Sequence, residues 1–154
     1  MQSGERFSAL IISDDRQTRA TTRVILEEYG YVVRSVMSQD AGLEILRTDV
    51  PDVVLFHVDL PGGMLSAPDE VAILSELLRN RHLANQHAFV LISRTPNETD
   101  EVLGHLLDRV AVRMLALPCT SAHLVEAIAS ALERRHIART AIADAMTGAQ
   151  QTAP

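Results

Sequence analysis

One stretch of the chain decides the expected fold, PDVVLFHVDLPG at residues 51–62. Its middle part, Val53–Val58, has the length of a β-strand and is almost continuously apolar. Strands with one face in water alternate apolar and polar residues, so this run is typical of a parallel strand that helices cover on both faces. Pro61-Gly62 then provides a turn signal before the next helical segment. The stretch therefore predicts a buried strand of an α/β protein.

The same kind of apolar run recurs four more times along the chain. These runs are Phe7–Ile12, Tyr31–Val36, Ala88–Ile92 and Val112–Leu117. Segments with helical periodicity and helix-capping residues follow the strands. They are Gln17–Tyr29, which ends at Gly30, a segment opened by Ser38, Asp69–Arg79, and segments that begin at Asn97 and Ser121. The alternation predicts an open, doubly wound α/β sheet of five parallel strands with helices on both faces.

Length and composition narrow the class of protein. The chain has 154 residues, 47% of them hydrophobic, so we expect one domain over 1–136 and a helical extension with a disordered tail over 137–154. The chain has 14 Lys and Arg residues and 20 Asp and Glu residues, and the resulting net charge of −6 argues against direct nucleic-acid binding. The single cysteine cannot form an internal disulfide, and neither a secretory leader nor a membrane-spanning run of roughly 20 apolar residues is visible. We therefore expect a cytoplasmic protein without a membrane partner.

Chemistry-bearing residues gather at the ends of the expected strands. In open α/β sheets, ligands bind outside the carboxyl ends of the strands, near the point where the strand order reverses. The residues at these ends are Ser13, Asp14 and Asp15; His57, Val58 and Asp59; Ser93 and Arg94; and Leu117 and Pro118. A functional site is therefore expected at the carboxyl edge of the sheet.

Four of these strand ends carry motifs of a known family. The motifs are the acidic pair Asp14-Asp15, the stretch of residues 51–62, the hydroxyl of Ser93 and the proline Pro118. They follow one another in the family's order, and over most of its length the chain resembles the receiver domain of two-component response regulators. The resemblance implies a flavodoxin-like (βα)5 fold and a switch that works by phosphorylation.

The resemblance also assigns roles to single positions. In the family, an acidic pair holds Mg²⁺, an aspartate ending the third strand accepts a phosphoryl group, a hydroxyl and a lysine bind its oxygens, and an aromatic residue on the fifth strand responds. Asp14 and Asp15 match the metal-holding pair, Asp59 matches the position whose carbonyl completes the metal site, and Ser93 matches the switch hydroxyl. The implied cofactor is Mg²⁺ or another divalent cation, which offsets the charge of the phosphoryl oxygens.

Three positions depart from the family pattern together. His57 stands at the acceptor position, Leu117 stands where the lysine is expected, and Met114 stands where the aromatic residue is expected. The aspartate that forms the usual acyl phosphate and the lysine that binds its oxygens are then both missing. We interpret the chain as a degenerate receiver, or pseudo-receiver, that is not an enzyme. We expect it to bind a protein partner or a second copy of itself through the fourth helix, fifth strand and fifth helix.

Two other functions are open from the sequence. In the first, the protein is a competent phosphoacceptor that uses a displaced residue, Asp59 or His57. In the second, Asp14, Asp15 and His57 form a divalent-metal site, since two carboxylates and an imidazole suit Mn²⁺, Fe²⁺ or Zn²⁺ better than Mg²⁺.

The same residues also have purely structural interpretations. Asp14 and Asp15 can cap the first helix, where carboxylates stabilise the N-terminus. His57 can be the hydrogen-bond partner of a neighbouring carboxylate. Met114 and Leu117 can simply extend the hydrophobic core.

Overall fold

A five-stranded parallel sheet forms the centre of the computed structural model, which describes residues 7–58, 72–80, 82, 86–93, 112–117 and 119–135. The strands are β1 (Ser8–Ile12), β2 (Val32–Val36), β3 (Val53–His57), β4 (Ala88–Ser93) and β5 (Arg113–Ala116). Their order in the sheet is β2-β1-β3-β4-β5, and all neighbouring pairs are parallel. The predicted sheet is confirmed, and each predicted strand agrees with the observed one to within a residue at either end.

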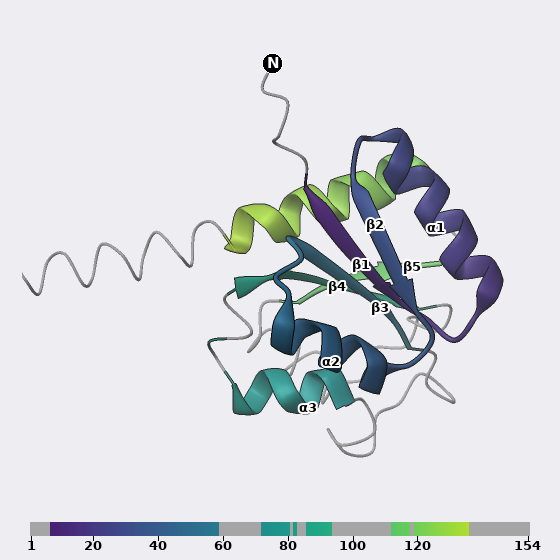
Figure 1. Ribbon diagram of the computed structural model, residues 1–154. Helices are drawn as coiled ribbons and strands as arrows, with labels where there is room; N and C mark the ends of the chain where they lie inside the picture. The colour runs from purple at the N-terminus through teal and green to yellow at the C-terminus, as the bar shows by residue number, and fades with distance from the viewer. Residues whose placement is uncertain are drawn as a thin grey trace, which may run out of the picture.

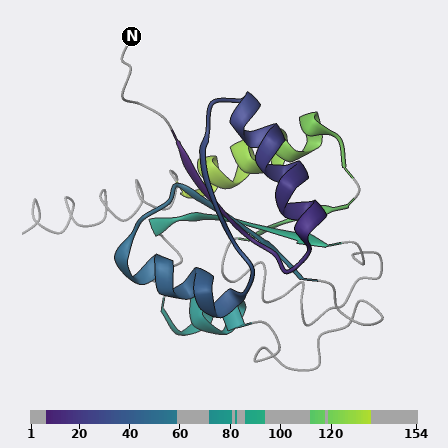
Figure 2. The same cartoon turned by 45° about the vertical axis from the view of Figure 1, so that its right-hand side comes forward.

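Helices cover both faces of the sheet. They are α1 (Arg16–Glu28), α2 (Gln39–Thr48), α3 (Ala72–Arg79) and a last helix that includes residues 121–135. Figures 1 and 2 show α1 and the last helix on one face, and α2 and α3 on the other. Within the described residues, no helix is long and apolar enough to cross a membrane. The predicted helix from Asn97, the start of the segment Asp69–Arg79 and the tail over 137–154 lie outside the described residues.

Alternate residues of the central strands supply two hydrophobic clusters, one on each face. The α2-side cluster consists of Leu10, Ile12, Leu46, Val54, Phe56, Ile73, Leu77, Phe89, Leu91 and Val112. The α1-side cluster consists of Ala9, Ile11, Leu26, Val53, Leu55, Ala88, Val90, Ile92, Leu124, Ile128 and Ala131. Because the central strands contribute side chains to both clusters, they are apolar at nearly every position, which is the pattern that identified them in the sequence.

Local capping residues set where the helices begin and end. Asp15 is the N-cap of α1, and its side chain accepts a hydrogen bond from the Thr18 N–H. Ser38 does the same for the Ala41 N–H at the start of α2. Gly30 follows α1 with a φ of 89°, a conformation that costs little only in a residue without a Cβ. The predicted roles of Ser38 and Gly30 are confirmed.

Helix α2 lies very close to the sheet at Gly42. A Cβ atom at this position would lie 2.8 Å from Cγ1 of Ile12 in β1 and would also overlap its Cδ1. Ile12 is buried in the α2-side cluster, and its side chain lies against Gly42. The absence of a side chain at Gly42 therefore permits the packing of α2 on β1.

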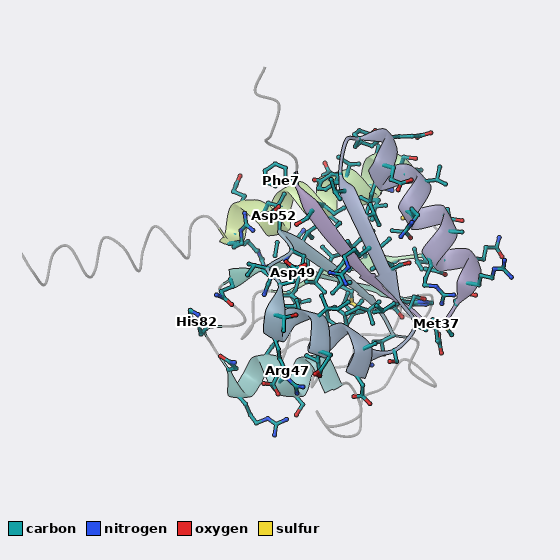
Figure 3. All side chains as sticks on the ribbon, viewed as in Figure 1. Phe7, Met37, Arg47, Asp49, Asp52 and His82 are labelled. Carbon is teal, nitrogen blue, oxygen red and sulfur yellow. The ribbon has the colours of Figure 1, made fainter. Side chains whose placement is uncertain are left out.

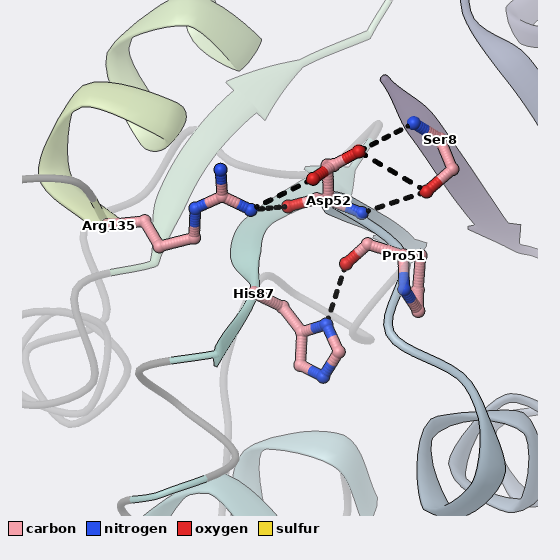
Figure 4. Close-up of polar contacts among 5 residues, drawn as sticks. All are labelled: Ser8, Pro51, Asp52, His87 and Arg135. Atoms are coloured by element: carbon pink, nitrogen blue, oxygen red, sulfur yellow. Dashed lines mark hydrogen bonds and ion pairs between the residues drawn. The ribbon is translucent and has the colours of Figure 1, made fainter. Parts of the chain in front are cut away.

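The two edges of the sheet carry different chemistry. In Figure 3, Met37 lies at the carboxyl edge, whereas Phe7 and Asp52 lie near the opposite, amino edge. At the amino edge the Asp52 carboxylate accepts a hydrogen bond from the Ser8 N–H at 2.8 Å (Figure 4). Nearby, His87 is buried, and its Nδ1–H donates to the Pro51 carbonyl oxygen at 2.7 Å. This edge is therefore held by polar contacts between segments, and the site predicted from the sequence lies at the other edge.

Candidate functional site

A cavity of about 510 Å³ lies at the carboxyl edge, where β1 and β3 end. Ser13 and Asp14, which follow β1, line it together with His57, the last residue of β3. Strands β1 and β3 are neighbours with Ile12 opposite Phe56, so the next residue of each strand falls beside the other. The register thus brings together strand ends that are 44 residues apart in the chain. We call this space the His57 cavity.

His57 is hydrogen-bonded to a buried serine inside this cavity. Its Nδ1 lies 2.8 Å from Oγ of Ser13, a residue that is 2% exposed. The same Oγ accepts a hydrogen bond from the Asp15 N–H at 3.1 Å, while its contact with the Asp15 carbonyl oxygen is 3.5 Å long. The hydroxyl has one hydrogen for Nδ1 and the Asp15 carbonyl oxygen, so the tautomer of the His57 ring sets whether the hydroxyl or Nδ1–H donates in this hydrogen bond. Sequence analysis placed Ser13 at a strand end, but only the β1–β3 register shows that His57 is its partner.

The two adjacent aspartates have different surroundings. Asp15 Oδ2 accepts hydrogen bonds from the N–H of Thr18, at 3.1 Å, and from the Thr18 hydroxyl. Asp14 is exposed and lines the His57 cavity, whereas Asp15 does not line it. The helix-capping interpretation is therefore confirmed for Asp15. Of the two aspartates, only Asp14 lines the His57 cavity, together with Ser13.

The described side chains at this strand end do not by themselves supply a three-ligand site for a divalent cation. Among the residues that the structure describes, no group of three or more His, Cys, Asp or Glu side chains could hold a metal ion. Asp14, Asp15 and His57 are all described, so they do not form the three-ligand metal site that the sequence left open. Mg²⁺ needs oxygen ligands in octahedral geometry and usually one or two carboxylates. Moreover, Arg19 Nη1 donates to the Ser13 carbonyl oxygen at 2.6 Å, which places a positive charge at the same strand end.

The third predicted metal position, Asp59, lies outside the described residues, as does Pro118. The three switch positions, Ser93, Leu117 and Met114, are all described. Ser93 ends β4 and is 3% exposed, and its carbonyl oxygen accepts a hydrogen bond from the Leu117 N–H at 2.8 Å. Leu117 packs against the α1-side cluster, while Met114 packs against the α2-side cluster. The interpretation of these two residues as extensions of the core is confirmed.

Comparisons with known proteins agree with this arrangement. The family model for the response regulator receiver domain matches residues 9–129. The transcriptional regulatory protein CseB of Streptomyces coelicolor is 31% identical over 130 residues, which cover 84% of this chain and 51% of that protein. The CseB protein of Streptomyces avermitilis is 29% identical over the same shares. The chain thus spans about half the length of the curated relatives that it matches.

Solved structures show the same fold. A CheY-like response regulator receiver domain protein from Methanospirillum hungatei has a TM-score of 0.66 and 16% identity, covering 86% of this chain and 98% of that chain. A sensor protein from Polaromonas has a TM-score of 0.68 and 22% identity, covering 85% and 99%. The flavodoxin-like (βα)5 arrangement predicted from the sequence is therefore confirmed.

Proposed function

The chain belongs to the response regulator receiver family of two-component signalling, and on that premise we propose that it is a pseudo-receiver. It is not phosphorylated at position 57, is not an enzyme, and signals by binding another protein. The main support is the hydrogen bond of 2.8 Å between Ser13 Oγ and His57 Nδ1. A receiver needs a carboxylate nucleophile at this position, whereas here an imidazole nitrogen is hydrogen-bonded to a buried hydroxyl.

Among the described residues, the surroundings of His57 offer few of the charges that phosphoryl transfer requires. Catalysis of this reaction consists almost entirely of positioning and of electrostatic stabilisation of the phosphoryl oxygens. The lysine of the family is replaced by Leu117, which packs against the α1-side cluster. Only one carboxylate, that of Asp14, lines the cavity among the described residues. Among the described residues that line the cavity there is no lysine or arginine to meet the negative charge of an incoming phosphoryl group.

The proposed binding face comprises the fourth helix, the fifth strand and the fifth helix. Of these elements, the structure describes β5 and the last helix. Strand β5 is an edge of the sheet, and its residues are half-buried or exposed. Since the phosphoryl-driven shift between two conformations is missing, we expect the face to be held in one binding-competent state. Sedimentation of the protein over a range of concentrations, together with pull-down from the source cells, tests for a dimer or a constant partner.

Phosphorylation is tested with acetyl phosphate and Mg²⁺, followed by intact-mass measurement at neutral pH. The unmodified protein should show no phosphoryl adduct. His57→Asp should show weak labelling, and His57→Asp with Leu117→Lys should show stronger or longer-lived labelling. Strong labelling of the unmodified protein would contradict the proposal, and peptide mapping would then show whether His57 or Asp59 is the displaced acceptor.

A further inference from the structure

A second cavity, of about 530 Å³, opens between α1 and the last helix. Its lining comes from α1, from the end of β4, from the residues after β5 and from the last helix. None of its lining residues belongs to the His57 cavity. Its volume falls within the range of about 300–1,000 Å³ that is usual for small-molecule sites. We call it the α1 cavity.

One wall of the α1 cavity is apolar. It consists of Ile25, Ile92, Leu117 and Leu124, with the thiol of Cys119 beside them. Ile92 and Leu124 belong to the α1-side cluster, and the other three residues pack against it. Leu117 has a double effect here, since the residue that replaces the family's lysine also supplies apolar surface to this wall.

Hydroxyl groups of α1 also line the cavity. Thr18, Thr21 and Thr22 line it, and they present neutral hydrogen-bonding groups. Thr22 is only 6% exposed as a whole residue, and its hydroxyl is not one of the buried side-chain atoms without a partner. A polar group of a ligand can take the place of water as the hydrogen-bond partner of such a hydroxyl.

The described residues that line the α1 cavity do not favour an ionic ligand. Among them there is no lysine or arginine, and the one charged residue is Asp15. The Asp15 carboxylate is occupied as the N-cap of α1 by the N–H and hydroxyl of Thr18. An anion would meet no positive charge in the described lining, and a cation would meet there only a carboxylate that is already hydrogen-bonded.

We propose that the α1 cavity binds a small neutral amphiphile. The apolar part of the ligand lies against Leu117 and Leu124, and a hydroxyl or carbonyl group lies against the threonine hydroxyls, including that of Thr22. This proposal does not depend on whether His57 accepts a phosphoryl group. The ligand would touch Leu117, whose N–H is bonded to the Ser93 carbonyl oxygen, and would thus lie directly beside a switch position of the family.

Binding can be measured with prodan, a neutral naphthalene ketone whose fluorescence shifts to the blue in apolar surroundings. We expect a saturable blue shift with the unmodified protein. Thr21→Phe places a ring at the exposed edge of the cavity and should abolish the shift. Thr48→Phe is the matched control, since Thr48 is an exposed threonine at the end of α2, on the other face of the sheet. A shift that is absent, or that survives unchanged in Thr21→Phe, overturns the proposal.

Cys119 reports on the same cavity independently, because it is the only cysteine of the chain. Burial raises the pKa of its thiol, so labelling with N-ethylmaleimide is followed at one fixed, mildly alkaline pH. Prodan at ten times its Kd should slow the labelling about tenfold, since only the unoccupied fraction of the protein reacts. Saturable binding that leaves the labelling rate of Cys119 unchanged would place prodan elsewhere on the protein and overturn the proposal.

The role of the threonine hydroxyls is tested by Thr22→Val, which removes a hydroxyl while keeping the side chain's shape. Loss of one hydrogen bond should weaken prodan binding by roughly 2- to 10-fold. Thr48→Val, away from the cavity, should bind prodan as the unmodified protein does. Equal affinities for Thr22→Val and the unmodified protein would overturn the assignment of the ligand's polar group to these hydroxyls.

Discussion

Arg135 Nη1 lies 3.1 Å from the carbonyl oxygen of Asp52 and 3.4 Å from its carboxylate Oδ1, although 83 residues separate the two along the chain (Figure 4). The side chains are 12% and 31% exposed, respectively. The same carboxylate accepts a hydrogen bond from the Ser8 N–H. Arg135 of the last helix, Asp52 before β3 and Ser8 at the start of β1 are thus joined at the amino edge, opposite the His57 cavity.

Replacement of Arg135 should destabilise the protein more than replacement of an exposed arginine. We expect Arg135→Met to lower the free energy of unfolding by about 1.5–3 kcal/mol, the usual contribution of a hydrogen bond to a charged group. Arg47→Met is the control, because the Arg47–Glu44 pair is 69% and 70% exposed. Arg47→Met should lower the free energy of unfolding by about 0.5 kcal/mol or less. Urea denaturation of both variants measures the difference, and equal losses would show that the contact with Asp52 adds no stability.

The two adjacent aspartates should differ in their contribution to stability. Asp15→Ala removes the N-cap of α1 and should lower the free energy of unfolding by about 1 kcal/mol. Asp14→Ala, at an exposed position, should change it by less than half as much. Asp15→Asn keeps a capping side chain and should recover most of the loss. If thermal melts instead rank Asp14→Ala as the more damaging change, the division of roles between the two residues is wrong.

A Mg²⁺ site should be restored when carboxylates return to the His57 cavity. Ser13→Asp with His57→Asp places two new carboxylates beside Asp14, and their repulsion should destabilise the metal-free protein. Mg²⁺ at 100 times its Kd should then stabilise this variant by about 2.7 kcal/mol. The unmodified protein should show no Mg²⁺-dependent change in Tm. A rise in Tm for the unmodified protein in a Mg²⁺ titration would refute our interpretation of the side chains at this strand end.

The contact between Gly42 and Ile12 predicts an unusual response to alanine. In an exposed helix interior, a change from Gly to Ala stabilises by about 1 kcal/mol. At Gly42 the new Cβ would overlap the buried Ile12, and overpacking of this kind costs about 1–3 kcal/mol, so we expect a net loss. Ile12→Val removes the Cδ1 atom and should reduce the loss in the double variant. A double-mutant cycle measures the coupling, and a coupling energy of zero would mean that the two residues do not meet.

Stability should fall at high pH because of Tyr31. Burial, and after it the negative charge of Asp52, raise the pKa of the Tyr31 phenol above its ordinary value of 10.0. A raised pKa contributes stability that is fully present below the unfolded pKa and is lost as the pH rises through the folded pKa. Tyr31→Phe should therefore lose less stability than the unmodified protein between about pH 9 and about pH 11. Tyr29→Phe, at an exposed position, should follow the unmodified protein; parallel curves for all three proteins would exclude the effect.

The sequence by itself determined the strands, their parallel arrangement and the edge at which the site lies. These features follow from local properties. A strand buried on both faces is apolar at nearly every position, Ser38 and Gly30 cap helices through neighbouring backbone groups, and all strands of a parallel sheet end at the same edge. The sequence also showed the departure from the family at position 57. The motif of residues 51–62 locates the acceptor position, and the residue type there is histidine.

Only the tertiary structure decided which side chains meet. Ser13 and His57 are brought together by the β1–β3 register, which nothing near either residue in the chain specifies. Asp15 does not line the His57 cavity, because α1 begins directly after it and its carboxylate accepts a hydrogen bond from the Thr18 N–H, an outcome that the acidic pair alone left open. Leu117 became part of a cavity wall because helices that are distant in sequence pack on either side of it. Side-chain partners depend on the register of strands and the packing of helices, and these arise only when the whole core assembles.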